Sequence, residues 1–285
     1  MVQLTFRRRE IKFVLTDDQR GDLTSLMRDY MSADEYGPST VCSVYFDTPS
    51  FLLARRSMGS PSYKEKIRAR SYGVCGDHTP VFVELKKKYD GIVYKRRCTL
   101  PPAEAQALLA GARTPQSQVE RELDYAICRY EGLAPAAFVA YDREAFYSPL
   151  DHDYRMTFDR CVRVRWDHLT LDWDDRGRRI LPEGQSILEV KTSKAIPLWL
   201  VRYLDEEGIR RTTWSKYGTA YREWLRSSPS SQPSWARCRA VPAREAPAPP
   251  RARHHVRATR RYNVSPASRI RRARDPSSRG RTPDS

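Results

Sequence analysis

A row of cations with a period of two is the pattern in this chain that could do chemistry. Lys64, Lys66, Arg68 and Arg70 alternate with Glu65, Ile67 and Ala69 in the segment SYKEKIRARSYG. Successive side chains of a β-strand point to opposite faces, so an extended chain here places four positive charges on one face. Such a row can bind a polyanion, since Arg forks and Lys point charges both pair with phosphate oxygens.

Pairs of the form Glu-x-Lys recur in three other segments with the same alternation. They lie in REIKF, VFVELKKK and SILEVKT, as Glu10 and Lys12, Glu84 and Lys86, and Glu189 and Lys191. A divalent cation would explain why carboxylates lie beside phosphate-binding cations. Mg²⁺ or Mn²⁺ takes oxygen ligands from carboxylate on one side and from phosphate on the other.

For any one strand, ordinary wetting of one face explains the alternation, since antiparallel sheets often bury one face and expose the other. The charged faces here recur in most strand candidates and use long cations with interspersed Glu. A closed antiparallel barrel, apolar outside under helices and charged inside, accounts for all of these observations together. Repulsion among the inward cations would be relieved by water and a bound phosphate chain.

The elements that position these residues read as one α+β domain with antiparallel pairing. Asp90-Gly91 predicts a tight hairpin. We expect a helix capped by Thr16, a second over Gln118–Tyr130, a third starting near Pro197 and a fourth over Tyr217–Leu225. The predicted strands are Phe6–Leu15, Thr40–Asp47, Tyr63–Tyr72, Val81–Lys88, Gly91–Leu100, Ala137–Tyr147, Arg155–Trp166 and Ser186–Thr192.

Composition divides the 285 residues into two parts. The net charge is +16, but the segment from Pro229 holds about 14 Arg, no Lys and about three acids, so about +11 of the charge lies there. We expect a folded domain over 1–226 and a disordered Arg-, Pro- and Ser-rich tail over 227–285. The tail can bind polyanions, or it can be a solvated segment without a specific role.

Other function classes find little support in the sequence. It has no phosphate loop, no dinucleotide loop, no G-x-S-x-G elbow and no kinase motif. The six cysteines are scattered without C-x-x-C spacing, which predicts small, reduced, buried side chains and a cytoplasmic protein. No signal peptide or membrane-spanning stretch is apparent, so action at the inner face of a membrane would need a separate membrane partner.

The order of several motifs resembles the catalytic domain of the vacuolar transporter chaperone (VTC) polyphosphate polymerases. That family lies within the CYTH-like, or triphosphate tunnel metalloenzyme, superfamily. The matching segments span about Phe6 to Leu225. They are REIKF, VYFDTPSFLLARRS, KIRARSYG, VFVELKKK with YKRRCTL, AYDREAFY, RMTFDR, ILEVKTS, IPLWL and WSKYG.

The resemblance implies an eight-stranded antiparallel tunnel with a charged lumen, which transfers the γ-phosphate of ATP to polyphosphate and releases ADP. It implies Mn²⁺ or Mg²⁺ as cofactor, with Glu189, Glu84 and Glu10 as metal ligands. The implied catalytic cations are Lys12, Arg68, Arg70, Lys86, Arg143, Arg155, Lys191 and Lys216. The implied nucleotide and phosphate contacts are Arg56 (or Arg55), Lys95, Arg97, Tyr141 and Ser215.

Two other functions remain open at this stage. A triphosphatase of the same tunnel type would give the phosphate to water, with nearly the same residues. A non-catalytic polyanion-binding module would bind without turnover and with strong salt dependence. We expect ATP and polyphosphate as partners and no specific nucleic acid.

Overall fold

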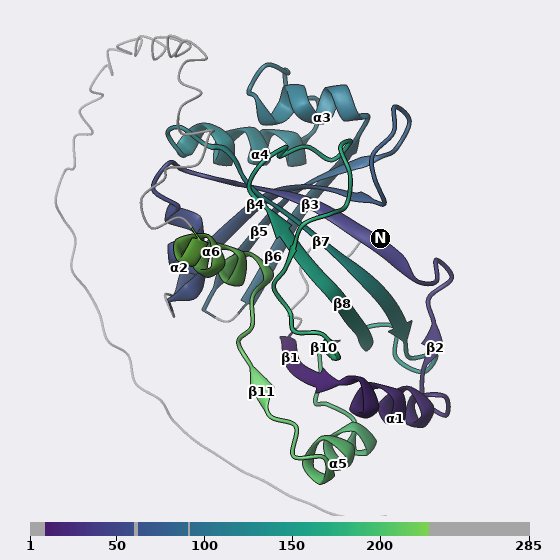
Figure 1. Ribbon diagram of the computed structural model, residues 1–285. Helices are drawn as coiled ribbons and strands as arrows, with labels where there is room; N and C mark the ends of the chain where they lie inside the picture. Colours follow the sequence, from purple (N-terminus) through teal and green to yellow (C-terminus); the bar gives the residue numbers. More distant parts are fainter. Residues whose placement is uncertain (1–8, 60–61, 91, 228–285) are drawn as a thin grey trace, which may run out of the picture. The chain divides into compact units, whose positions relative to one another are not determined.

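The charged rows of the sequence lie on the strands of one antiparallel sheet (Figure 1). The computed structural model describes residues 9–59, 62–90 and 92–227, so the predicted tail lies outside the described residues except for Ser227. Three strands of two residues each extend the sheet: β2 (Ser32–Ala33), β9 (Arg178–Arg179) and β11 (Arg211–Thr212). The long strands are β1 (Arg9–Thr16), β3 (Ser39–Asp47), β4 (Tyr63–Tyr72), β5 (Val81–Tyr89), β6 (Ile92–Leu100), β7 (Ala134–Tyr147), β8 (Arg155–Arg165) and β10 (Gln185–Thr192).

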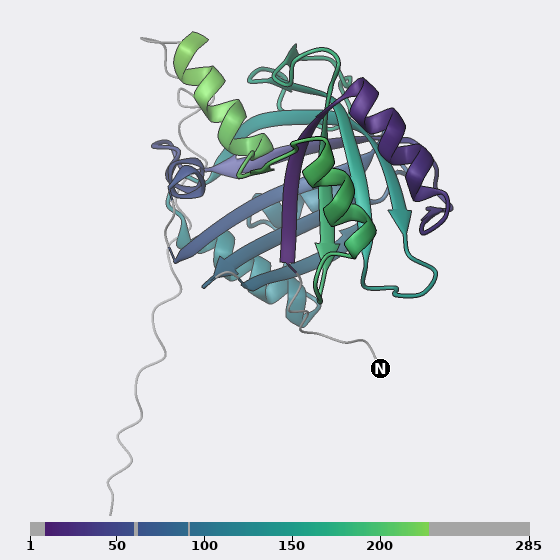
Figure 2. The same ribbon diagram turned by 90° about the horizontal axis from the view of Figure 1, so that it is seen from below.

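In the described residues the sheet is curved, but the strands at its two ends are not hydrogen-bonded to each other. The strand order is β11-β1-β10-β8-β7-β3-β4-β5-β6, with β2 on β7 and β9 on β8. The eight long strands are those expected from the sequence, but the closed eight-stranded barrel is corrected to an open sheet of eleven strands. Part of the free edge of β1 pairs with β11, where Lys12 lies opposite Thr212 and Phe13 opposite Arg211. Figure 2 shows how the curve brings β1 to face the blue strands β4 to β6.

Six helices are present in the described residues: α1 (Asp17–Met27), α2 (Leu52–Met58), α3 (Pro102–Leu109), α4 (Gln118–Arg129), α5 (Leu198–Glu206) and α6 (Lys216–Ser227). Thr16 forms the predicted cap of α1, as part of a capping box with Gln19. Ser117 caps α4. Pro197 is the N-cap of α5, one position before the first helical residue where we expected it. Helices α2 and α3 were not predicted from the sequence.

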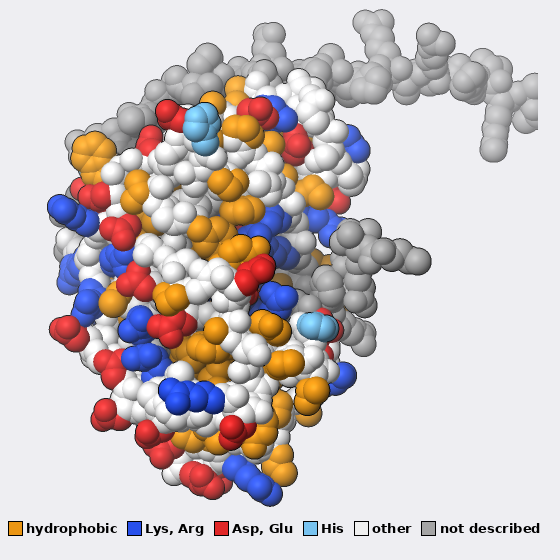
Figure 3. Space-filling model, turned by 90° about the vertical axis from the view of Figure 1, so that its right-hand side faces the viewer, with side chains coloured by type: hydrophobic (Ala, Val, Ile, Leu, Met, Phe, Trp, Pro, Cys, Tyr) orange, Lys and Arg blue, Asp and Glu red, His pale blue; other side chains and the backbone are white. Residues whose placement is uncertain are grey.

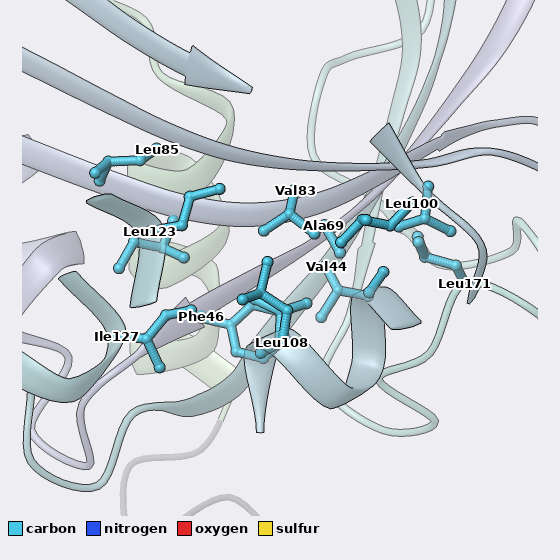
Figure 4. Packing of buried hydrophobic residues seen from close by; sticks show 14 of the residues in the cluster. Val44, Phe46, Ala69, Val83, Leu85, Leu100, Leu108, Leu123, Ile127 and Leu171 are labelled. Atoms are coloured by element: carbon cyan, nitrogen blue, oxygen red, sulfur yellow. The ribbon is translucent and has the colours of Figure 1, made fainter. Parts of the chain in front are cut away.

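The outer face of the sheet is apolar and covered by helices, as predicted. In one cluster, alternate residues of β3, β4 and β5 pack against α3 and α4, as Val44, Ala69 and Val83 do with Leu108 and Leu123 (Figure 4). A second cluster packs β1, β8 and β10 against α1 and α5. Burying one face of each strand fixes the strand register, and a slip by one residue would turn the charged row into the core.

The inner face is charged over only part of its length. A third cluster fills the rest, with Val41 and Tyr45 of β3, Val139 of β7 and Ile187 of β10 packed against residues of α6 such as Tyr217. The bulge between Ala140 and Asp142 in the β7–β8 pairing changes which β8 side chains face inward. The predicted charged interior is therefore a cavity on part of the inner face, with this apolar cluster, which we call the apolar plug, beside it.

Two further sequence expectations can be compared with the structure. Cys42 and Cys75 are buried, but Cys128 is exposed, which corrects the expectation that the cysteines are all buried. None of the helices in the described part of the chain combines the length and apolarity that crossing a membrane requires.

Candidate functional site: a basic cavity inside the curved sheet

A cavity of about 400 Å³ lies on the charged part of the inner face. Nine of its lining residues are Lys or Arg and two are Glu. A broader surface hollow of about 550 Å³, over the loop after β8, shares none of these residues. The cavity is lined by Glu10, Lys12, Tyr45, Lys66, Arg68, Arg70, Lys86, Val93, Tyr94, Lys95, Tyr141, Arg143, Glu189, Lys191 and Lys216.

Two of the three Glu-x-Lys pairs face each other across the β1–β10 ladder. Lys12 lies opposite Glu189, and Glu10 lies opposite Lys191. The Glu189 carboxylate is 3.8 Å from Lys12 Nζ and 3.2 Å from Lys191 Nζ. Burial acts to raise the pKa of Glu189, but Lys191, Lys12 and Arg143 outweigh it and hold this pKa well below its usual value. Glu189 is therefore a carboxylate anion across the physiological range.

The third pair lies on β5, which is paired with β4 and β6 and faces β1 across the cavity. We call the gap between β4 and β5 on one side and β1 with Ser215 on the other the seam, because no strand pairing crosses it in the described residues. Lys86 lies beside Lys66 and Lys95 in the β4–β5 and β5–β6 pairings, so it has no carboxylate opposite it. It reaches across the seam to Glu10, with Nζ–Oε distances of 2.7 and 2.6 Å. Lys66 also crosses the seam, to Ser215 Oγ at 3.0 Å.

Glu84 holds three cations from the neighbouring strands. Its oxygens lie 2.6 Å from Arg68, 2.7 Å from Lys95 and 2.8 Å from Arg97. Burial would raise the pKa of Glu84, but the charges of Arg68, Arg70 and Lys95 lower it strongly. Burial also lowers the pKa of Lys95 to about 8, against the opposing effect of Glu84. The Glu84 carboxylate thus orients the guanidinium groups of two arginines.

Asp159 is a buried carboxylate at the site that sequence reasoning did not select. It accepts hydrogen bonds from Arg143 at 2.6 and 2.8 Å and from Lys216. Burial would raise its pKa, but Arg143 and Lys216 lower it. The signal was present, because Asp159 follows Arg155 by four residues in a strand of period two.

Two tyrosines complete the wall. Tyr45 OH accepts a hydrogen bond from Arg68 at 3.1 Å, and Tyr141 OH accepts one from Arg70 at 3.1 Å. The Tyr141 ring also lies 4.3 Å from Lys216 Nζ and 5.1 Å from the Arg143 guanidinium. Since each hydroxyl accepts from an arginine, its own proton can be donated to a ligand oxygen. Tyr45, like Lys66, is a cavity residue absent from the site set implied by the resemblance.

The structure brings most of the expected site residues together, but not all of them. Eleven of the sixteen line the cavity, Glu84 and Ser215 contact lining residues, and Arg97 pairs with Glu84. Arg155 is exposed at the start of β8, opposite Lys191 and outside the lining. Arg56 is exposed on α2 and also lies outside the lining.

The carboxylates of the cavity fit a divalent cation only in part. Glu10 and Glu189 both line the cavity and are close enough for each to affect the pKa of the other. Within residues 9–59, 62–90 and 92–227, no group of three Asp, Glu, His or Cys side chains could hold a metal ion. Mg²⁺ is commonly bound by one or two carboxylates together with substrate phosphates and water, and these two residues fit that pattern. Glu84, already engaged with three cations, fits it less well.

Fold and site together define a curved antiparallel sheet, covered by helices outside, that holds a basic cavity inside. Residues 7–225 match the model of the VTC domain family. The chain therefore belongs to the VTC domain family, which confirms the resemblance of its motifs. A search of curated proteins found no match.

Solved structures with a similar fold are distant. One, from Bacillus halodurans with a suggested adenylate cyclase activity, shows 16% identity over 81% of this chain and 94% of its own, with a TM-score of 0.40. Another, from Hippeastrum, was named for adenylyl cyclase activity and is described as having a dominant triphosphatase activity. It shows 14% identity over 76% of this chain and 95% of its own, with a TM-score of 0.46.

Proposed function

We propose that the cavity is the active site of a polyphosphate polymerase, which transfers the γ-phosphate of ATP to a polyphosphate chain and releases ADP. One observation carries the proposal: within a VTC domain, nine Lys and Arg side chains line a single cavity that four carboxylates neutralise only in part. Two of those carboxylates, Glu84 and Asp159, lie outside the lining and form ion pairs with cations that line the cavity. The excess of about five positive charges is suited to a triphosphate or a longer phosphate chain.

The reaction needs positioning and charge neutralisation more than covalent chemistry from the protein. A terminal oxygen of the acceptor chain attacks the γ-phosphorus, a new P–O–P bond forms, and the bond to the β–γ bridging oxygen breaks to release ADP. Arg68 and Arg143 are held rigidly by Glu84 and Asp159, so they can stabilise the developing charge without reorganising. A divalent cation held by Glu189 and Glu10 would neutralise further phosphate charge when bound.

The deciding experiment incubates the purified protein with ATP and Mn²⁺ and measures polyphosphate, ADP and orthophosphate. We expect one ADP to form for each phosphate unit that is added to the polymer. Orthophosphate with ADP and no polymer would identify a triphosphatase instead. Binding of polyphosphate with no loss of ATP would identify a binding module.

Replacing the central carboxylate tests the site itself. Glu189→Gln keeps the shape of the side chain but removes the anion next to Lys12 and Lys191, so we expect polymer synthesis to fall by at least about a hundredfold. Glu183→Gln is the matched control, because Glu183 is 91% exposed and pairs only with Arg179 among the described residues. Equal polymer yields from the two variants would contradict the proposed site.

A further inference from the structure

Lys66 differs from most other cavity cations in having no carboxylate partner. Lys12, Arg68, Lys86, Lys95, Arg143, Lys191 and Lys216 each pair with Glu10, Glu84, Asp159 or Glu189. Within the part of the chain that the structure describes, Lys66 Nζ has no Asp or Glu oxygen within 4.0 Å, and its hydrogen-bond partner is Ser215 Oγ at 3.0 Å.

The groups around Lys66 are themselves positive. Lys12 of β1, Lys86 of β5, and Arg68 and Lys64 of β4 all act against a charged ammonium at this position. Burial is the largest cause of the lowered pKa of Lys66, and these four cations add to it. A charged lysine here needs an anion, and the described residues supply none close by.

Ser215 adds a second feature that favours an anion. Its Oγ accepts from Lys66 and from the backbone N–H of Gly218, so it is the N-cap of α6. Both acceptor positions of the hydroxyl are thus used, and its own proton can be donated to a ligand oxygen. The amino end of α6 also carries a partial positive charge. A phosphate group beside Lys66 would meet the ammonium, the hydroxyl and the helix end together.

We propose that Lys66 and Ser215 form a phosphate-binding subsite at which the bound phosphate group supplies the counterion of Lys66 and increases its protonation. The inference rests on the proposed function only in taking a phosphate chain as the ligand. At the other cations, a ligand competes with a carboxylate that is already in place. At Lys66 it supplies the counterion itself, and its negative charge raises the affinity of the amine for a proton.

Calorimetry of inorganic tripolyphosphate binding, without metal or nucleotide, tests the subsite. Titrations near neutral pH in buffers of different ionisation enthalpy give the number of protons taken up on binding. Wild type and variants are compared, because the ligand's own titration then cancels. The variants are Lys66→Met, Lys66→Arg and the matched control Lys88→Met, since Lys88 lies on the neighbouring strand β5 but outside the cavity lining.

We expect Lys66→Met to lose up to one proton of uptake and to bind about ten- to a hundredfold more weakly, the loss typical of a charge-assisted hydrogen bond. Lys66→Arg should retain affinity without the proton uptake, and Lys88→Met should match the wild type. Proton uptake by Lys66→Met equal to that of the wild type would overturn the proposal, as would a wild type that does not bind tripolyphosphate. Failure of the proposed function is a separate result: the proton difference persists, but ATP gives no polymer.

Discussion

Glu189 and Asp159 each hold two cations in the cavity wall. Glu189 lies between Lys12 and Lys191, and Asp159 binds Arg143 and Lys216. Removing one carboxylate from such a cluster leaves two cations next to each other with no counterion. At the scale of a single residue, we therefore expect these carboxylates to contribute to folding as well as to the proposed reaction.

We expect Asp159→Asn to lower the free energy of unfolding by about 3–5 kcal/mol near neutral pH, the usual cost of breaking a buried ion pair. Because the folded-state pKa of Asp159 lies below its usual value of 3.8, its contribution is complete above that pH. The contribution is lost as the pH falls below 3.8 toward the folded pKa. Chemical denaturation across this acidic window should show the difference between variant and wild type shrinking.

Asp22→Asn serves as the control for this change, because Asp22 is an exposed residue of α1. It should leave the stability of the protein close to that of the wild type at every pH. A difference between Asp159→Asn and wild type that did not change with acidity would contradict the role assigned to the carboxylate.

Lys66→Met should stabilise the ligand-free protein. The folded-state pKa of Lys66 lies well below 10.5, so between these two values the unfolded chain binds more protons and the stability of the wild type rises with pH. Methionine removes this dependence. We expect the variant to melt at a higher temperature than the wild type near neutral pH, with a gap that closes as the pH approaches 10.5. Melting scans over pH measure it, and a gap of opposite sign would contradict the burial of an unpaired amine.

At the scale of elements, one carboxylate joins β3, α2 and α6. Asp47, at the end of β3, accepts from the backbone N–H groups of Leu53 and Ala54 at 2.8 Å each, and from Tyr217 OH at 2.6 Å. Tyr217 also stacks on Tyr45, with ring centroids 4.6 Å apart. These contacts fix the start of α6, which carries Ser215 and Lys216 into the site.

Tyr217→Phe should lower the free energy of unfolding by about 1.5–3 kcal/mol, the cost of losing a buried hydrogen bond to a charged group. It should also reduce polymer synthesis, because Lys216 follows the position of α6. Tyr221→Phe is the control, as Tyr221 is a buried tyrosine of the same helix without a hydroxyl hydrogen bond among the described residues. Denaturation and polymer yield are measured on both, and equal losses would contradict a specific role for the Asp47 contact.

Strands were more predictable from the sequence than helices or contacts between distant residues. Alternation gave Tyr63–Tyr72 with both ends correct, because one face of β4 is buried and the other is charged. The helix α2 was missed because it is short and its first residue follows Phe51, which has no side-chain cap. The capping oxygens come from Asp47 instead. Closure was not predictable, since alternation assigns faces but does not show which edges meet.

The site was predictable where one strand carried the signal. The Glu-x-Lys pairs of β1 and β10 both line the cavity, on the charged faces that the alternation predicted. The bond of Lys86 to Glu10 depends on how the sheet curves, and that of Tyr217 to Asp47 joins residues 170 positions apart. Arg56 was expected from motif order alone, and the structure leaves it exposed on α2.

At the scale of the whole molecule, one face of the described residues carries a group of Lys and Arg side chains (Figure 3). Lys and Arg side chains gather around a hollow on the face shown, with acidic side chains among them. The buried apolar cluster that contains Val41, Val139 and Ile187 fills the rest of the inner face beside the charges. Binding a polyanion should therefore affect the stability of the entire domain.

Tripolyphosphate at about a hundred times its dissociation constant should stabilise the folded state by about 2.7 kcal/mol. For a domain of this size that corresponds to a rise in melting temperature of about 5–10 °C. The rise should diminish with added NaCl, because salt screens the charges involved. Thermal melting with tripolyphosphate, orthophosphate and salt measures this, and a rise that did not respond to salt would contradict a charge-based site.

The internal carboxylates make the cavity behave as an ion exchanger loaded with its own counterions. Glu84, Asp159, Glu189 and Glu10 occupy most of its cations before any ligand arrives. A small anion with one or two charges gains little by competing with groups tethered at high effective concentration. A chain with many phosphates can displace several of these contacts at once, and each contact made brings the next within reach. We therefore expect the cavity to select by valence and to bind a polyphosphate chain or a triphosphate in preference to single phosphate groups.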